Sequence, residues 1–97
     1  MTARGSLGLP WYHCDDYAFL LTLFSDPDKL PGTFDEWLKR AEHVEKQLQV
    51  AGFAVVRVWI RPDAFEAWCA ERGIPPDQRA RLSFANEAAR EHHSQLE

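Results

Sequence analysis

The clearest pattern of hydrophobic and polar positions lies between residues 53 and 60, where β-branched and aromatic residues dominate. This run directly follows Gly52 and predicts a strand. Because side chains alternate along a strand, the run has one apolar face and one mixed face. The apolar face carries Ala54, Val56, Val58 and Ile60, and the mixed face carries Phe53, Val55, Arg57 and Trp59. We expect the apolar face to pack on helices, and the mixed face to be partly solvated or covered by a partner.

This strand needs a hydrogen-bonding neighbour, because unpaired backbone N–H and C=O groups are costly when buried. No second run of the same quality occurs in the sequence. Residues 7–12 could pair with it, although Gly8 and Pro10 would restrict that segment to an edge role. Alternatively, the same strand of a second copy could pair with it across a two-fold axis, as in many homodimers. We favour the second arrangement.

Two helices are expected before the strand. The first begins at Asp15 or Asp16, and its apolar positions recur at i, i+3, i+4 and i+7. That stripe consists of Tyr17, Leu20, Leu21 and Phe24, and Phe19 and Leu23 widen it. We therefore expect this helix to be buried on more than one side. The second helix begins with a capping box at Thr33 and Glu36. Its inward positions are Phe34, Trp37, Leu38, Ala41, Val44, Leu48 and Ala51.

Two further helices are expected after the strand. The third begins at Pro62, where Asp63 and Glu66 could form a second capping pair, and ends at Gly73. Asp77 can cap the fourth. Their inward positions are Phe65, Trp68 and Cys69 in the third helix, and Ala80, Phe84 and Ala88 in the fourth.

These elements predict a single α+β domain over residues 1–97, with about four helices packed around one central strand at residues 53–60. The sheet is completed either by the N-terminal segment or by a second subunit. Residues 1–8 and 91–97 are expected to fray. A chain of 97 residues can form one core without disulfides.

Composition narrows the function classes. Hydrophobic residues make up 45% of the chain and the formal net charge is −4, so neither disorder nor a general attraction to nucleic acid is indicated. Cys14 and Cys69 have no metal-binding spacing. There is no signal peptide, no apolar run long enough to cross a bilayer, and no common nucleotide or hydrolase motif. We expect a cytoplasmic protein without a cofactor, a metal, or a nucleic-acid or membrane partner.

A candidate ligand site lies where the strand meets the third helix. Arg57, Trp59 and Arg61 share one strand face, and a guanidinium–aromatic–guanidinium ladder could hold an anion or a planar ligand. Arg61 also lies near a helix start, where amide groups favour anions. The alternative is that these arginines form ion pairs with helix carboxylates or shield Trp59 by stacking. We favour the alternative, because most exposed strand arginines serve solubility.

A candidate interface lies on the mixed face of the strand. Trp37 and Trp68 fall on inward helix positions, whereas the burial of Trp11 and Trp59 is less certain. Aromatic anchors are enriched at protein interfaces, and an exposed apolar patch is a liability for a monomer. We therefore predict that this surface contacts a second copy, or another protein. The predicted contact residues are Phe53, Val55, Trp59 and Trp11.

A third possibility is chemistry at His13 and Cys14, as a reactive thiolate or a metal site completed by His92 and His93. Adjacent residues of a helix do not share a face, so capping by the neighbouring aspartates is the favoured interpretation. We assign no catalytic and no metal-binding residue.

The motifs of the chain resemble those of a family of small uncharacterised bacterial proteins, and the resemblance covers nearly the whole sequence. It is carried by Trp11-Tyr12, Asp16-Tyr17, Leu30-Pro31-x-Thr33-Phe34-x-Glu36-Trp37, Arg57-Val58-x-Ile60-x-Pro62-Asp63-x-Phe65-x-x-Trp68-Cys69 and Ala80-Arg81-x-x-Phe84-Ala85. The resemblance implies a free-standing cytoplasmic protein and no particular activity. The leading functional prediction is a non-enzymatic, self-associating interaction module. A protein that binds a small anionic or planar ligand is the alternative, and an enzyme or metal site using Cys14 and His13 comes third.

Overall fold

The computed structural model describes residues 5–96 of the chain, and the side chains of residues 5–91. Its elements, in chain order, are β1 (Ser6–Trp11), α1 (Cys14–Leu23), a 3₁₀ turn (Pro27–Lys29), α2 (Phe34–Val50), β2 (Ala54–Trp59), α3 (Pro62–Arg72) and α4 (Gln78–Leu96). The fold is α+β, and the described residues form four helices and a two-stranded sheet. The predicted strand and all four predicted helices are confirmed.

The N-terminal segment completes the sheet. β1 pairs with β2 in parallel, in a register that runs from Ser6 opposite Ala54 to Trp11 opposite Trp59. Of the two expected arrangements, pairing with the N-terminal segment is therefore confirmed, and pairing of β2 with a second copy stays a prediction. Parallel strands need a long crossover, and α1 and α2 supply it within the same chain, so the pairing carries no cost of association. Because β1 begins at Ser6, part of the segment expected to fray is paired instead.

The outer edge of β1 is closed. The inner edge of β1 pairs with β2: at the two ends of this pairing, the N–H of Ala54 donates to the carbonyl of Gly5, and the N–H of Ile60 donates to the carbonyl of Trp11. Alternate residues of a strand face its neighbour, so the backbone groups of Gly8 and Pro10 face away from β2. The N–H of Gly8 donates to Oδ1 of Asn86 in α4 at 2.9 Å, and proline has no N–H. The edge role predicted for Gly8 and Pro10 is confirmed.

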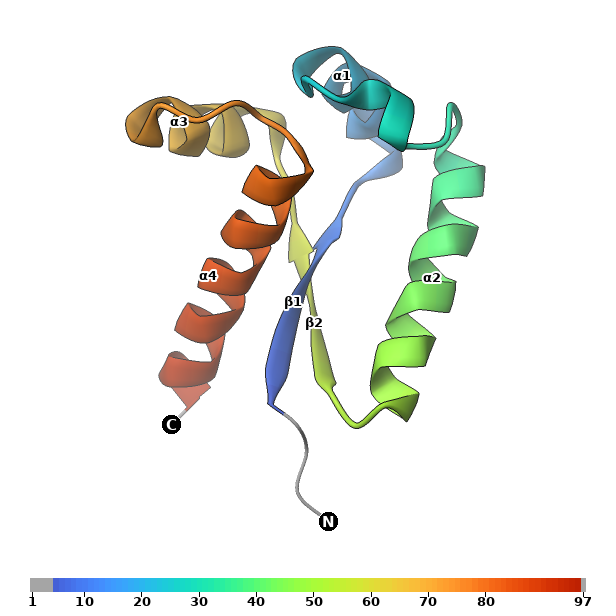
Figure 1. Ribbon diagram of the computed structural model, residues 1–97, viewed down its shortest axis with the longest axis vertical. Coiled ribbons are helices and arrows are strands. Elements are labelled where there is room, and N and C mark those ends of the chain that lie inside the picture. The colour runs from blue at the N-terminus through green and yellow to red at the C-terminus, as the bar shows by residue number, and fades with distance from the viewer. Residues whose placement is uncertain (1–4, 97) are drawn as a thin grey trace.

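Two helices flank the strand pair on opposite sides, α4 and α2, while α1 and α3 lie together beyond the end at which both strands finish (Figure 1). α4 approaches so closely that a Cβ at Gly8 would run into the backbone carbonyl of Ala85. Ala85 and Ala89 pack on Val58, from the apolar strand face. The small residues of α4 thus let a helix lie directly on the sheet.

The main core lies between the strand ends and helices α1, α2 and α3. Its buried members are Trp11, Tyr12, Tyr17, Leu20, Phe24, Trp37, Ala41, Ile60, Phe65, Cys69 and Ala80. Three expectations about burial are wrong. Phe19 is 57% exposed, because α1 has its core on one side only, and Ala51 is exposed because it lies at the C-terminal cap of α2. Ala54, at the start of β2 on the face expected to pack on helices, is exposed as well.

Three of the predicted helix ends are confirmed. The Oγ1 of Thr33 accepts the N–H of Glu36 at 3.3 Å, and Oδ1 of Asp77 accepts the N–H of Ala80 at 3.0 Å. Gly73 ends α3 in the left-handed region, with φ 64°, which favours glycine. The predicted capping pair at Asp63 and Glu66 does not form. α3 begins at Pro62 after Arg61, and no side chain caps it.

Candidate functional site

The outer edge of β2 is open. The backbone groups of Val55, Arg57 and Trp59 face away from β1, and within residues 5–96 none of them has a hydrogen-bond partner on that side. Both Arg57 and Trp59 are exposed. β2 therefore presents a row of unpaired N–H and C=O groups, which is a template for pairing with another strand.

Arg57 is held by α2. Its Nε and Nη2 donate to the carboxylate of Glu45 at 2.6 and 2.8 Å, and its guanidinium lies over the ring of Trp11, 3.9 Å from the centroid. The hydrogen bonds from Arg57 lower the pKa of Glu45 below its ordinary value. The charge of Arg57 is thus matched within the chain, as the favoured alternative predicts.

Trp59 lies at the exposed end of the same face. It is 45% exposed and stacks on the imidazole of His13, with ring centroids 4.0 Å apart and planes 15° apart. His13 is itself exposed and stands just before α1. A flat aromatic surface therefore remains accessible beside the open edge of β2.

Arg61 pairs with α1, since its Nε lies 3.3 Å from Oδ2 of Asp16. Each of the three residues predicted to bind a ligand thus has its own partner: Glu45 for Arg57, His13 for Trp59 and Asp16 for Arg61. The structure does not leave their side chains free to converge on one ligand.

The predicted interface is divided between surface and core. Trp59 is exposed, and Phe53 and Val55 are half-buried. Trp11 is only 3% exposed and lies edge-on against Trp37, so its assignment to the interface needs correction. Trp11 is buried because α2 covers the end of β1 on this face. The exposed part of the predicted interface is therefore centred on Trp59.

The cysteines have contrasting environments. Cys14 is exposed, with Sγ 3.7 Å from Oδ1 of Asp15, whereas Cys69 is buried and burial raises the pKa of its thiol. Among the described residues, no three His, Cys, Asp or Glu side chains gather as metal ligands. The side chains of His92 and His93 lie outside the described part.

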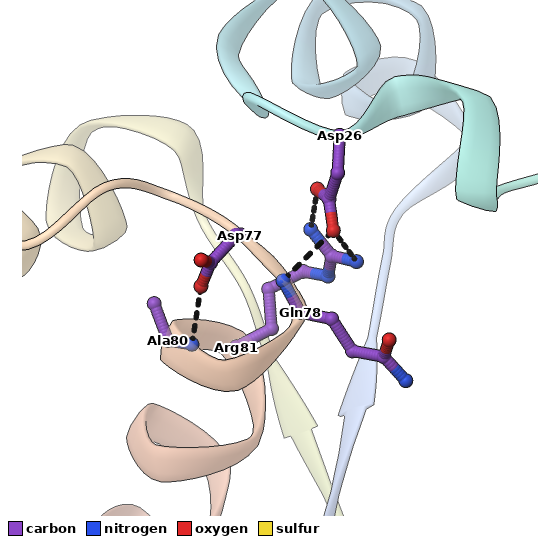
Figure 2. Close-up of polar contacts among 5 residues, drawn as sticks. All are labelled: Asp26, Asp77, Gln78, Ala80 and Arg81. Carbon is purple, nitrogen blue, oxygen red and sulfur yellow. Dashed lines mark hydrogen bonds and ion pairs between the residues drawn. The ribbon is translucent and has the colours of Figure 1, made fainter.

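An ion pair that the sequence analysis missed joins the loop after α1 to the start of α4. Figure 2 shows Asp26 reaching the guanidinium of Arg81 and the backbone N–H of Gln78. Arg81 is 3% exposed. In the sequence it resembled the other arginines of its helix. Its position directly after the inward residue Ala80, and three before Phe84, was the available signal for burial.

Comparisons with protein-family models, curated proteins and solved structures found no match for this chain. The resemblance to small bacterial proteins therefore stays a prediction. Within residues 5–96, the helices are too short or too polar to cross a membrane.

Proposed function

We propose that this protein is a non-enzymatic interaction module that forms a homodimer through the outer edge of β2. The observation that carries the proposal is the contrast between the two edges of one sheet. Pro10 and the Gly8–Asn86 hydrogen bond close the edge of β1, whereas β2 has neither proline nor a covering side-chain hydrogen bond over Val55, Arg57 and Trp59 within the described residues.

A second copy is the favoured occupant because the sheet is small. A sheet of two strands is smaller than usual, and a further strand at the open edge of β2 would take up the outward backbone groups of Val55, Arg57 and Trp59. Antiparallel pairing of two β2 strands across a two-fold axis would give a four-stranded sheet with both outer edges closed by Pro10 and Asn86. The charge of Arg57 offers little opposition, because Glu45 pairs with it.

The backbone pattern restricts the register of such a dimer. Only odd-numbered residues of β2 direct their backbone groups outward, so they must face odd-numbered residues of the second copy. Centring the two-fold axis on Arg57 would place like charges directly opposite each other, which is destabilising. Centring it on Val56 places Val55 opposite Arg57 on each side of the axis, so that the two arginines do not face each other. We favour this register.

The proposal includes a cytoplasmic location. Cys14 is exposed and unpaired with Cys69, and exposed free thiols suit a reducing compartment.

Light scattering with a matched pair of variants tests the dimer. Wild-type protein at micromolar concentration should have twice the 11.2 kDa mass of one chain. Val55→Pro removes an outward N–H that the monomer does not use, and proline is tolerated at such edge positions. It should run as a folded monomer. Val55→Ala keeps the N–H and should remain a dimer. A monomeric wild type, or a dimeric Val55→Pro variant, would exclude association through this edge.

A further inference from the structure

A cavity of about 230 Å³ lies beside the outer edge of β1, away from the β2 edge that is proposed to form the dimer. Three elements line it: the end of β1, the first half of α2 and the first turns of α4, with the 3₁₀ turn at its margin. None of the residues proposed for the dimer lines it. Its floor is apolar and includes Leu9, Trp37, Ala41 and Val44.

The charged groups around this cavity are all cationic. Lys29, Arg40 and Arg81 line it, and none of its lining residues is Asp or Glu, although the whole chain has a net charge of −4. Within the described part, neither Lys29 nor Arg40 forms an ion pair, and Glu36, one turn before Arg40, does not reach it. Two positive charges at the cavity therefore remain uncompensated.

Asp26 does not cancel this charge. Its carboxylate is occupied by Arg81, at 2.7 and 3.3 Å, and by the N–H of Gln78. Arg81 and Asp26 thus form a neutral pair, which leaves Lys29 and Arg40 in excess. The side chain of Gln78 extends away from Asp26 (Figure 2), and Gln78 also lines the cavity.

A buried hydroxyl provides a second, independent indication of a ligand. Tyr12 lines the cavity and is 3% exposed, yet its hydroxyl makes no hydrogen bond to any described residue. The hydroxyl oxygen of Tyr12 is not completely enclosed, so part of it remains accessible from outside the protein. Burial raises the pKa of Tyr12 well above the ordinary range of tyrosine, so the hydroxyl stays protonated and can donate. Buried polar groups normally have a partner.

We propose that this cavity binds a small organic carboxylate with an apolar body. The apolar body lies on Leu9, Trp37 and Ala41, and the carboxylate lies toward Lys29, Arg40 and the Tyr12 hydroxyl. The volume fits one ring and a carboxylate, because a cavity of about 150 Å³ holds a benzene molecule. Arylacetates and branched-chain acids belong to this class.

Phenylacetate is the test probe, and its neutral isostere phenylacetamide is the matched control ligand. Titration followed by amide chemical shifts should give a dissociation constant below about 1 mM for phenylacetate, with the largest shifts at Leu9, Ala41 and Gln78. Phenylacetamide should bind roughly tenfold more weakly, because it lacks the charge that Arg40 recognises. Equal affinity for the two ligands would overturn the proposal, as would no binding of phenylacetate up to about 10 mM.

Variants separate the cavity from general attraction to a cationic surface. Arg40→Ala should weaken phenylacetate binding roughly tenfold, whereas Lys39→Ala, at an exposed neighbour outside the cavity, should leave it unchanged. Ala41→Leu, checked for folding by circular dichroism, should fill the floor and abolish binding. A folded Ala41→Leu variant that binds like the wild type, or equal losses in the two charge variants, contradicts the proposal. Val55→Pro should bind normally, because this site does not depend on the dimer.

Discussion

Arg81 and Asp26, 55 residues apart in the sequence, form a two-point ion pair in which Nη1 and Nη2 donate to the two carboxylate oxygens at 2.7 and 3.3 Å. Their side chains are 4% and 12% exposed. Asp26 also accepts the backbone N–H of Gln78 at 2.9 Å, so one carboxylate satisfies both a buried cation and the first turn of α4. The guanidinium of Arg81 lies over the ring of Phe24, at the end of α1. This pair fixes α4 to the crossover.

Asp26→Ala should destabilise the protein by about 3 kcal/mol, because it leaves the guanidinium of Arg81 buried without its counter-ion. Urea denaturation of the wild type and the variant measures the change. Replacing both residues by apolar ones of similar size, Asp26→Leu with Arg81→Met, should cost less than Asp26→Ala, because no buried charge is then left unpaired. A double variant less stable than Asp26→Ala would show that packing, and not the charge, decides stability here.

Glu45→Ala should cost less than about 1 kcal/mol, although it breaks an ion pair with similar bond lengths. The side chain of Arg57 is 44% exposed, so water replaces Glu45 when the carboxylate is removed. The same urea experiment measures this change. A cost equal to that of Asp26→Ala would mean that Arg57 is shielded from water by something beyond the described contacts, such as the second copy.

The stability contributed by Asp26 should depend on pH. Burial is the largest single influence on its pKa and raises it, but the hydrogen bonds and charge of Arg81, together with the N–H of Gln78, outweigh burial and leave the pKa below 3.8. A carboxyl whose pKa is lower in the folded state stabilises that state above its unfolded pKa, and this contribution is lost as the pH falls through the folded pKa. The difference in unfolding free energy between the wild type and Asp26→Asn should therefore be constant above about pH 5 and shrink below about pH 4. A constant difference down to about pH 2.5 would contradict this assignment.

The local parts of the fold could be predicted because their signals are local. The strand at residues 54–59 and the caps at Thr33, Gly73 and Asp77 depend on a few neighbouring residues, and the structure has all of them. The partner of β2 could not be chosen in this way. β1 contains Gly8 and Pro10, which lower its strand propensity, and its pairing depends on a distant helix.

The burial of Arg81 and the exposure of Phe19 were missed for a related reason. A helical stripe shows which residues share a face, but it does not show how wide the contact with the rest of the protein is. On α1 the contact is narrower than the apolar stripe, which leaves Phe19 exposed. On α4 the contact is wide enough to enclose Arg81, and the counter-ion comes from a loop 55 residues earlier. Such pairs require the tertiary structure.

Gly8→Ala should destabilise the protein by at least about 3 kcal/mol, because overpacking against a backbone carbonyl cannot be relieved by a side-chain rotation. The added Cβ would meet the carbonyl of Ala85, so α4 would have to move off β1 and lose the Asn86 hydrogen bond. Gly32→Ala is the control, since nothing lies within 4 Å of a Cβ at that position. Thermal unfolding distinguishes the two variants. If both behave like the wild type, α4 does not lie directly on β1.

Acrylamide quenching of tryptophan fluorescence should show whether the open edge of β2 is covered in the wild-type protein. Trp59 is 45% exposed, Trp68 is half-buried beneath the guanidinium of Arg72, and Trp11 and Trp37 are 3% and 5% exposed. Acrylamide should therefore quench Trp59 more strongly than the other three tryptophans in dilute protein. Trp59→Phe should remove this largest contribution and identify its source. If β2 pairs with a second copy, Trp59 becomes covered, and quenching of the wild type should fall as the protein concentration rises. Quenching of the monomeric Val55→Pro variant should stay constant over the same range. A wild type whose quenching is also independent of concentration, at concentrations where light scattering detects a dimer, would place the contact on a different surface.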